Sequence, residues 1–404
     1  MSLERYDLLI VGAGPAGSFA AELLAKSGAR VALFDGRPEG EPKACGGGVT
    51  AKALKAWPQL LNAVGRTINE LDLYSPSSKK LHLALEEPFA IYSRVAFDCY
   101  LRDRARASGA HVISEKISAR KTINNNSGWQ VKTDTGTERT GSFLVAADGA
   151  NSGIAKKLAG PLPPSDMEVA FGYRAPLPAN EIAATAVAFL PGWVGYAWAF
   201  PRPDHISFGI ATTQDAFEHE PLDQLLWRFM IGYYLQSEGK KVNFWQDGAD
   251  TPERTKIEEH LRRTAERYAA RIPGLSAKTW DSRTVCGEDW ALLGDAAGFA
   301  DPVTGEGIYY ALRSAELFAE CYLNGAPKSY EQTWRADFGA ELRRAAQMRR
   351  RFYGNFFGAP FTERMIEFAR GHRGVKRVLG DLVAGEQGYV DLKKKLVKSA
   401  LRPV

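Results

Sequence analysis

The 404-residue sequence predicts an α/β protein with a parallel-sheet domain that binds a dinucleotide, an antiparallel-sheet domain and a helical C-terminal region. Three observations carry this prediction. Residues 8–35 contain a strand, a glycine-rich turn, a helix and a second strand that ends in an acid. Residues 161–211 contain short strands separated by turn residues. The chain after residue 329 is mostly helical and basic.

Residues 6–35 have the pattern of a Rossmann-like nucleotide-binding unit. Leu8–Val11 is a short apolar run, as expected of a strand that is buried on both faces. The next turn reads GAGPAG, and each of its glycines has a physical role. Gly12 permits the tight turn, Gly14 lets the backbone approach a pyrophosphate, and Gly17 brings the following helix close to the sheet. The N-terminus of that helix presents free N–H groups to the phosphate.

An acid completes this pattern. Asp35 ends the second strand, and its carboxylate would accept hydrogen bonds from an adenosine ribose. A glycine-rich turn alone is weak evidence, because such turns also occur in ordinary α/β domains. Here the strand before the turn, the helix after it and the acid about 20 residues further on all agree. The sequence therefore predicts a nucleotide-binding site.

A second segment of this kind lies near residue 295. Trp290–Leu293 is another buried apolar strand, and it leads into the sequence GDAAG. Asp295 follows the strand end, where an aspartate can accept a hydrogen bond from a polyol hydroxyl. The helix that begins near Gly305 directs its positive end at whatever lies in front of it. Together the two segments suggest one extended dinucleotide that is held at both ends.

The composition argues against several classes of protein. The net charge is +5 and the basic residues are spread along the chain, so a nucleic-acid binder is not indicated. The four cysteines and six histidines lack metal-ligand spacing, which favours a reduced, intracellular protein without a structural metal. The sequence shows no signal peptide, and no apolar run reaches ~18 residues, the length of a transmembrane helix. We expect a cytoplasmic protein, with association at the inner membrane surface left open.

The middle of the chain is expected to be largely antiparallel. Short strands are predicted at 169–174, 184–190, 195–200 and 206–211, a hairpin at 71–85, and helices at 91–107, 222–236 and 253–270. In the strand at 195–200, a period of two places Tyr196, Trp198 and Phe200 on one face. Such a face either packs a core, which is the commoner outcome, or lines an apolar pocket.

A glycine-rich loop follows Asp35. Residues 43–48 read KACGGG, and three consecutive glycines make a flexible segment that can lie against a ligand. A plain surface loop is an equally good interpretation of these residues.

Several motifs together resemble the FAD enzymes related to para-hydroxybenzoate hydroxylase. They are GAGPAG, the helix start with Arg94 and Asp98, ADGANS at 147–152 and GDAAGFADPVTGEGI at 294–308. Within that group, the sequence is most similar to the geranylgeranyl reductase family. PKACGGG at 42–48 resembles its KxCGG element, GYAWAFP at 195–201 its YxWxFP strand, and TGEGIYYAL its flavin-side helix. No motif covers the C-terminal helices.

The resemblance implies FAD as the cofactor. It implies that the segments Cys45–Gly48 and Pro302–Ile308 surround the isoalloxazine, and that Arg94 and Asp295 contact the phosphates and ribitol. There are departures: Asp35 stands where the broad family usually has Glu, and ADGANS lacks the Arg that often follows it. The implied cofactor-binding residues are Gly12, Gly14, Ala16, Gly17, Asp35, Gly36, Cys45, Gly46, Gly47, Gly48, Arg94, Asp148, Asp295, Pro302, Gly305, Glu306, Gly307 and Ile308.

The implied reaction is reduction of C=C double bonds in a prenyl chain of geranylgeranyl type, by hydride transfer from reduced flavin N5. An isolated alkene is a poor hydride acceptor, so protonation and hydride transfer must be closely concerted in a dry pocket. The implied catalytic residues are Cys45, Tyr196 and Trp198. The two aromatic side chains would line the substrate channel, and Cys45 would act as a proton donor or, more simply, in packing or positioning.

Two alternative functions remain open. The first is oxygen activation, as in an FAD-dependent monooxygenase or halogenase acting on an apolar or aromatic substrate. Halogenases carry a WxWxIP strand, to which residues 196–201 are only distantly similar, and a lysine for which Lys79 and Lys80 have no supporting context. The second is a non-catalytic flavin-binding protein at a membrane surface, motivated by the lysine-rich segment 392–401.

The motifs also divide the chain. An FAD-binding domain is predicted at 1–70, 88–160 and 283–328, a substrate-binding domain at 71–87 and 161–282, and a helical C-terminal region at 329–404. The expected partners are an apolar, isoprenoid or lipid substrate and an electron donor, either NAD(P)H or a redox protein. Peripheral contact with a membrane is left open, and no nucleic acid is expected.

Overall fold

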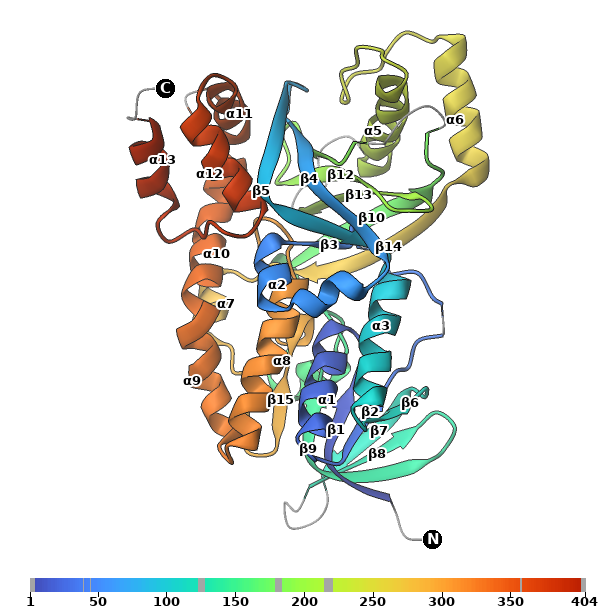
Figure 1. The fold of residues 1–404 in the computed structure, drawn as a ribbon, viewed down its shortest axis with the longest axis vertical. Helices are drawn as coiled ribbons and strands as arrows, with labels where there is room; N and C mark the ends of the chain where they lie inside the picture. The colour runs from blue at the N-terminus through green and yellow to red at the C-terminus, as the bar shows by residue number, and fades with distance from the viewer. Residues whose placement is uncertain are drawn as a thin grey trace. The chain divides into compact units, whose positions relative to one another are not determined.

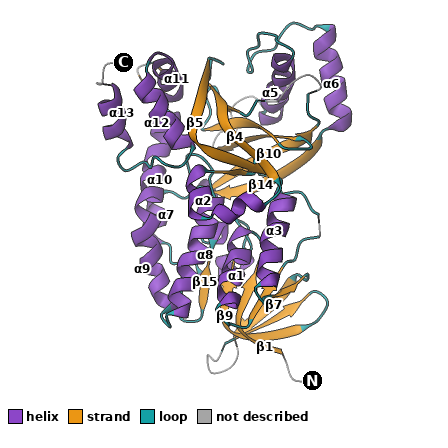
Figure 2. Cartoon of the chain, viewed as in Figure 1, coloured by secondary structure: helices purple, strands orange, loops and turns teal. Residues whose placement is uncertain are grey.

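The computed structural model describes residues 4–38, 40–43, 45–122, 128–178, 184–213, 221–356 and 358–400 (Figure 1). Ala44, in the motif PKACGGG, lies outside the described residues. The model confirms the α/β fold class, with helices and two large sheets (Figure 2). The chain forms two compact units. The first unit contains residues 1–41, 95–166 and 272–346, and the second contains residues 42–94, 167–271 and 347–404.

The first unit is built on a mixed sheet. Its order is β6 (His111–Ile113), β2 (Val31–Phe34), β1 (Glu4–Val11), β9 (Glu138–Ala146), β8 (Trp129–Thr133) and β7 (Ile117–Thr122), and β15 (Trp290–Leu292) also pairs with β9. Strands β6, β2, β1, β9 and β15 are mutually parallel, whereas β7 and β8 form an antiparallel extension. Strand β2 and the C-terminal halves of β1 and β9 are apolar and buried, since side chains buried on both faces need no polar alternation.

Helices cover this sheet. Helices α1 (Pro15–Lys26) and α8 (Ile308–Leu323) lie side by side (Figure 1). The other helices that lie wholly or mainly in this unit are α3 (Arg94–Ala107), α4 (Gly153–Leu158), α7 (Ala277–Ser282) and α9 (Tyr330–Trp334), with the 3₁₀ turns Pro164–Asp166, Gly294–Ala296 and Pro327–Ser329. A π-helical segment, Arg335–Gly339, joins α9 to α10 (Ala340–Tyr353), which continues into the second unit.

The second unit is built on a large twisted sheet. Its order is β14 (Glu266–Pro273), β10 (Met167–Ala175), β13 (Ile206–Thr213), β12 (Gly195–Pro201), β11 (Ala186–Phe189), β4 (Gly65–Tyr74), β5 (Lys80–Tyr92) and β3 (Gly48–Val49). Strands β10, β13, β12 and β11 are antiparallel to one another in this order, as predicted, and so are β4, β5 and β3, whereas β11 runs parallel to β4.

The core of the second unit lies between this sheet and α5 (Leu222–Ser237). Phe208 of β13 and Phe229 of α5 are fully buried there with Phe244. The remaining elements of the unit are α2 (Ala51–Ala56), the 3₁₀ helix Pro58–Asn62, α6 (Pro252–Thr264), β16 (Asn355–Phe356), β17 (Ala359–Pro360), α11 (Phe361–Gly371), α12 (Arg373–Val383) and α13 (Leu392–Ala400).

Two predicted helices were too long. Ile91 and Tyr92 belong to β5, because they pair with β3 and β4, and the helix begins only at Arg94. The helix predicted at 253–270 ends at Thr264 as α6, and the rest is the edge strand β14. Charged residues are compatible with both structures, because an edge strand, like a surface helix, exposes one side to water.

The spatial grouping differs from the predicted domain boundaries in several places, and the two longest differences are at 42–70 and in the C-terminal region. Residues 42–70, expected in the FAD-binding domain, cluster with the second unit, because β3 and α2 pack against β5. The C-terminal helical region is divided: residues up to 346 cluster with the first unit and later residues with the second. Hairpin β4–β5 lies in the second unit.

Candidate active site

The structure brings four predicted site segments to one edge of the first sheet. Gly12 follows β1, Asp35 follows β2, Asp148 follows β9 and Asp295 follows β15. Because these strands are parallel and adjacent, their carboxyl ends meet at the same edge, where ligands bind in open α/β sheets. The two nucleotide-binding segments inferred from the sequence are therefore neighbours in the fold.

The glycines of the first turn differ in what surrounds them. At Gly12, where φ is +105°, an added Cβ would lie 2.4 Å from the carbonyl oxygen of Ala147. At Gly17, an added Cβ would lie 1.9 Å from the carbonyl oxygen of Gly12. Around Gly14, by contrast, no heavy atom lies within 4 Å of the Cβ position. Gly12 and Gly17 are thus required by packing, whereas Gly14 keeps space open at the start of α1.

Helices α1 and α8 both begin at a glycine that provides no side-chain cap. The N-cap residues are Gly14 for α1 and Gly307 for α8, and no side-chain hydrogen bond caps either helix. In the same unit, α4 and α7 are capped by the hydroxyls of Ser152 and Ser276. The first N–H groups of a helix need partners, so the start of α1, beside the open space at Gly14, fits the phosphates of a bound dinucleotide.

Asp295 faces the start of α8. Its Oδ1 lies 3.1 Å from the Cβ position at Gly307, so this glycine leaves the carboxylate in direct contact with the helix N-terminus. Gly294 beside it packs against Ala16 of α1 and Ala311 of α8, at 3.2 and 3.3 Å from its Cβ position. Close packing of small residues therefore places the carboxylate between the two uncapped helices.

Arg283 supports the Asp295 segment from inside the protein. Its Nε donates to the carbonyl of Ala297 at 2.8 Å, and its Nη2 donates to that of Ala296 at 3.2 Å. The side chain is buried, and burial lowers the pKa of the guanidinium. A guanidinium nevertheless stays protonated in proteins, so Arg283 supplies a fixed positive charge beneath this loop.

Asp301 gives the loop before α8 its shape. Its Oδ1 accepts hydrogen bonds from the backbone of Val303 at 2.7 Å and Thr304 at 3.2 Å. Its own backbone N–H donates to Glu306, and its carbonyl accepts from Gly305. These bonds fix the predicted segment Pro302–Ile308 without help from a ligand.

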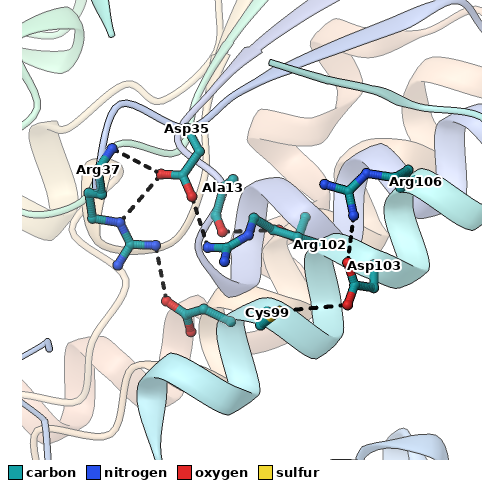
Figure 3. Close-up of polar contacts among 9 residues, drawn as sticks. Ala13, Asp35, Arg37, Cys99, Arg102, Asp103 and Arg106 are labelled. Carbon is teal, nitrogen blue, oxygen red and sulfur yellow. Dashed lines mark hydrogen bonds and ion pairs between the residues drawn. The ribbon is translucent and has the colours of Figure 1, made fainter. Parts of the chain in front are cut away.

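Asp35 lies within a network of charged side chains (Figure 3). Arg102 of α3 donates from Nη1 to Asp35 Oδ2 at 2.8 Å, and the backbone of Arg37 donates to Oδ1 at 3.3 Å. The Arg37 guanidinium continues to Asp98 at 3.3 Å. The acid and the helix residues Asp98 and Arg102 therefore meet, and two arginines fix the orientation of the expected ribose acceptor.

In the second unit, the Cys45–Gly48 segment packs against the aromatic face of β12. An added Cβ at Gly46 would lie 2.9 Å from Phe200 and 3.4 Å from Nε1 of Trp198. At Gly48 it would lie 2.6 Å from Phe89. The ring of Tyr196 lies 6.0 Å from that of Trp198. The three residues proposed from the sequence as catalytic are therefore close together in one unit.

The two faces of β12 have different surroundings. Ala197 and Ala199 belong to the core beneath α5, whereas Tyr196, Trp198 and Phe200 point to the opposite side of the sheet. Tyr196 and Phe200 are only partly buried. The small residues pack the core beneath α5, whereas Trp198 is buried on the other side of the sheet and packs against Gly209. Only Tyr196 and Phe200 leave part of their rings exposed, and these two positions favour the pocket interpretation.

Arg202 holds the Cys45 segment in place. Its Nη2 donates to the carbonyl oxygens of Cys45 at 2.7 Å and Gly46 at 3.1 Å. Beside it, Ser207 Oγ lies 3.4 Å from the Cys45 carbonyl and 2.6 Å from the hydroxyl of Tyr268. The surrounding protein shields that hydroxyl from water, which raises the pKa of Tyr268 to about 12. The phenol therefore stays neutral near neutral pH.

The remaining predicted residues have less distinctive positions. Arg94 begins α3 and is buried, and in the spatial grouping it belongs to the second unit. The Cβ position of Gly36 lies 3.0 Å from Lys116. All four cysteines are free thiols. Within the described ranges, His, Cys, Asp and Glu side chains form no cluster suited to a metal ion, and no helix is long and apolar enough to cross a membrane.

Sequence reasoning missed Arg202, Arg283 and Asp301. The two arginines belong to no motif, and their backbone partners become visible only in the fold. Asp301 had a local signal, because an aspartate two residues before a backbone N–H that it accepts from is a common turn arrangement.

Comparison with known proteins gives a consistent result. A model of the FAD binding domain family matches residues 5–173. The chain is 28% identical over 351 residues to a chloroplastic geranylgeranyl diphosphate reductase of Oryza sativa subsp. japonica, covering 80% of this chain and 67% of that protein. It is also 28% identical to a digeranylgeranylglycerophospholipid reductase of Methanosphaerula palustris, covering 82% of each.

Solved structures share the fold. A geranylgeranyl bacteriochlorophyll reductase-like protein from Thermoplasma acidophilum matches with a TM-score of 0.73 and 22% identity, over 98% of this chain and 100% of that chain. The flavin-dependent brominase Bmp2 matches with a TM-score of 0.67 and 19% identity, over 98% of each chain. At these identities the structures show the fold alone.

Proposed function

This chain belongs to the geranylgeranyl reductase family of FAD-dependent oxidoreductases, and we propose that it reduces C=C double bonds in the prenyl chain of an isoprenoid or lipid. The observation that carries the proposal is the packing of the Cys45–Gly48 segment on the aromatic face of β12. That face is apolar and is turned away from the core, so it offers a wall for a hydrocarbon chain.

The first unit would hold the cofactor. The open space at Gly14 and the uncapped start of α1 suit the pyrophosphate, Asp35 suits the adenosine ribose, and Asp295 suits a ribitol hydroxyl. The uncapped start of α8 would place a positive dipole where reduced flavin gathers negative charge. FAD, once reduced, supplies the hydride for this chemistry. These residues fit FAD in number and kind.

The second unit would hold the alkene. Tyr196 presents a partly exposed ring backed by the buried Trp198, and neither side chain has a charge to attract water, so the pair would keep a prenyl segment dry and oriented. An isolated alkene must be protonated as it accepts hydride, so the reaction requires alignment more than binding strength. We propose that Cys45 packs against the substrate or positions it at the reacting carbon. Direct proton donation by its thiol is the alternative role.

The test is anaerobic oxidation of the reduced holoenzyme by prenyl lipids, followed by flavin absorbance and by mass spectrometry of the product. We expect flavin reoxidation together with products heavier by two hydrogens per reduced bond. A Cys45→Ser variant should turn over more slowly, whereas Cys99→Ser, a change of another partly exposed cysteine in α3, should behave as wild type. Reduced enzyme that no prenyl compound oxidises would refute the proposal.

The contacts of Lys79 and Lys80 disfavour the halogenase alternative, because that chemistry requires a lysine and these two residues are the candidates for it. Lys79 forms ion pairs with Glu363, at 3.2 Å, and with Glu367, and Lys80 pairs with Asp72 at 2.7 Å. These pairs occupy both lysines in the β4–β5 turn region and beside α11. Substrate-stimulated oxygen consumption by the reduced enzyme would nevertheless favour oxygen chemistry over alkene reduction.

The electron donor is proposed to be NAD(P)H or a redox protein. The sequence contains one glycine fingerprint of the dinucleotide type, and the proposed FAD site uses it. The oxidised holoenzyme can be mixed anaerobically with NADH, NADPH or a reduced ferredoxin-type carrier in separate experiments. Only a competent donor will reduce the flavin, and so lower its visible absorbance, within the time of one turnover.

We further propose peripheral membrane contact through α13. Lys393, Lys394 and Lys395 are exposed there, and such a cluster attracts anionic lipid. The double variant Lys393→Glu/Lys394→Glu should reduce co-sedimentation with anionic liposomes. A matched control, Lys256→Glu/Arg263→Glu on the exposed face of α6, should not. Equal loss in both variants would indicate a general charge effect and remove α13 as the contact.

A further inference from the structure

We propose that Arg202 is the positioning residue for Cys45, a role that rests on the proposed function of the Cys45–Gly48 segment. Its guanidinium donates to two successive carbonyl oxygens, those of Cys45 and Gly46, from one nitrogen. In that arrangement the backbone N–H of Gly47 donates to the Cys45 sulfur at 3.3 Å. The arginine thus fixes the backbone that directly follows the Cys45 Cα, and with it the direction of the side chain.

Glycine at position 47 makes this arrangement possible. Its φ is +74°, and an added Cβ would lie 2.0 Å from the carbonyl oxygen of Tyr92 and 3.0 Å from Nη2 of Arg202. The same glycine accepts a hydrogen bond from the Tyr92 backbone at 2.9 Å. The segment is therefore held between the end of β5 and the guanidinium, and a flexible glycine run acquires a single conformation.

Arg202 is itself held firmly. It lies in the turn after β12, where its backbone N–H donates to His205 at 2.7 Å, and its Nη1 lies 3.2 Å from His205 Nε2. The side chain is 6% exposed. A buried cation that donates to backbone carbonyls costs desolvation, and such a cost is commonly retained where geometry must be fixed. The aromatic wall of β12 and the clamp on Cys45 thus come from one continuous strand and turn.

Hydrogen exchange of the apoprotein tests the clamp without any turnover. The amides of residues 46–48 should be protected in the wild type. They should exchange about tenfold faster in Arg202→Met, which removes the donors but keeps a buried apolar stem. Arg202→Lys should restore most of the protection, because it keeps the charge and a donor. The matched control Arg262→Gln, an exposed arginine on α6, should leave these amides unchanged.

Turnover gives the second readout. Arg202→Met should lower kcat about tenfold or more with KM within about threefold of wild type, since alignment and not substrate affinity is lost, and Arg202→Lys should recover kcat. Rapid exchange of residues 46–48 in the wild type, or unchanged exchange in Arg202→Met, would overturn the proposal. If Arg202→Met does not fold, the wild-type protection and the Lys variant decide the question. Wild-type enzyme that reduces no prenyl compound would refute the proposed function alone, and the exchange result would still judge the clamp.

Discussion

Arg102 and Asp35 form a 2.8 Å ion pair that joins helix α3 to the carboxyl end of β2. Both side chains are largely buried, and Arg37 holds the other carboxylate oxygen. Two arginines on one carboxylate leave its remaining lone pairs in fixed directions. The proposed ribose acceptor is therefore oriented before the cofactor arrives.

Replacing this acid should weaken FAD binding. Asp35→Asn removes the charge that makes a hydrogen bond to a ribose hydroxyl strong, and we expect the Kd for FAD to rise about 10- to 100-fold. Flavin fluorescence titration of the apoprotein measures it. Asp103→Asn on α3, where the exposed acid contacts Arg106 and Cys99 (Figure 3), is the control and should bind FAD normally. Equal affinities for both variants would remove Asp35 from the site.

Alanine substitutions at Gly12 and Gly14 should have different effects, the first on stability and the second on FAD binding. Gly12→Ala should lower the melting temperature of the apoprotein, because its Cβ would collide with the Ala147 carbonyl at a positive φ. Gly14→Ala should leave the melting temperature near wild type, since its surroundings are empty, yet weaken FAD binding by placing a methyl group where the phosphates approach. Thermal melts and FAD titrations of both variants decide it. Normal FAD binding by Gly14→Ala would place the pyrophosphate elsewhere.

Loss of Arg283 should loosen the Asp295 segment. Arg283→Met leaves the carbonyls of Ala296 and Ala297 without a charged donor, which should cost about 2 kcal/mol in the free energy of unfolding. Urea denaturation measures this loss, and FAD affinity should fall with it. Arg343→Met, which removes an exposed ion pair with Asp281, is the control and should leave the free energy of unfolding near the wild-type value.

His205 should make the protein sensitive to acid. Burial, followed by the charge of Arg202, lowers the pKa of its imidazole. The folded state therefore keeps the ring neutral while the unfolded chain takes up a proton, so stability falls as pH drops below about 6.5. Melting curves from about pH 7.5 to 5.5 should show a smaller decline for His205→Gln than for wild type. His260→Gln, on exposed α6, should follow the wild type, and an unchanged decline in His205→Gln would refute this prediction.

The parallel half of the fold was predictable because its signals are local. The turn at Gly12 and the acid at Asp35 lie within one strand–helix–strand unit, and Asp295 directly follows its own buried strand. Parallel strands must then bring these ends to one edge. The helix limits near Tyr92 and Thr264 were missed. The strands next to these helices form because they pair with strands that are distant in the sequence, and their own residues would also suit a helix.

The hydrogen bonds from Arg202 to the Cys45 segment and from Arg283 to the Asp295 segment could not be predicted from the sequence. Arg202 reaches Cys45 across 157 positions, and its partners are backbone carbonyls, which have no side-chain signature. Only the sheet order, with β12 and the β3–β5 edge in one unit, brings them together. The alternation in β12 was visible from the start, but which face was the core depended on where α5 packs.

That alternation gives β12 two independently tunable sides. Enlarging Ala197 or Ala199 would disturb the packing beneath α5, whereas exchanging Tyr196 or Phe200 would reshape a surface that the core does not use. Variants that probe the proposed hydrocarbon-binding surface can therefore be confined to alternate positions of a single strand, where they do not disturb the core beneath α5.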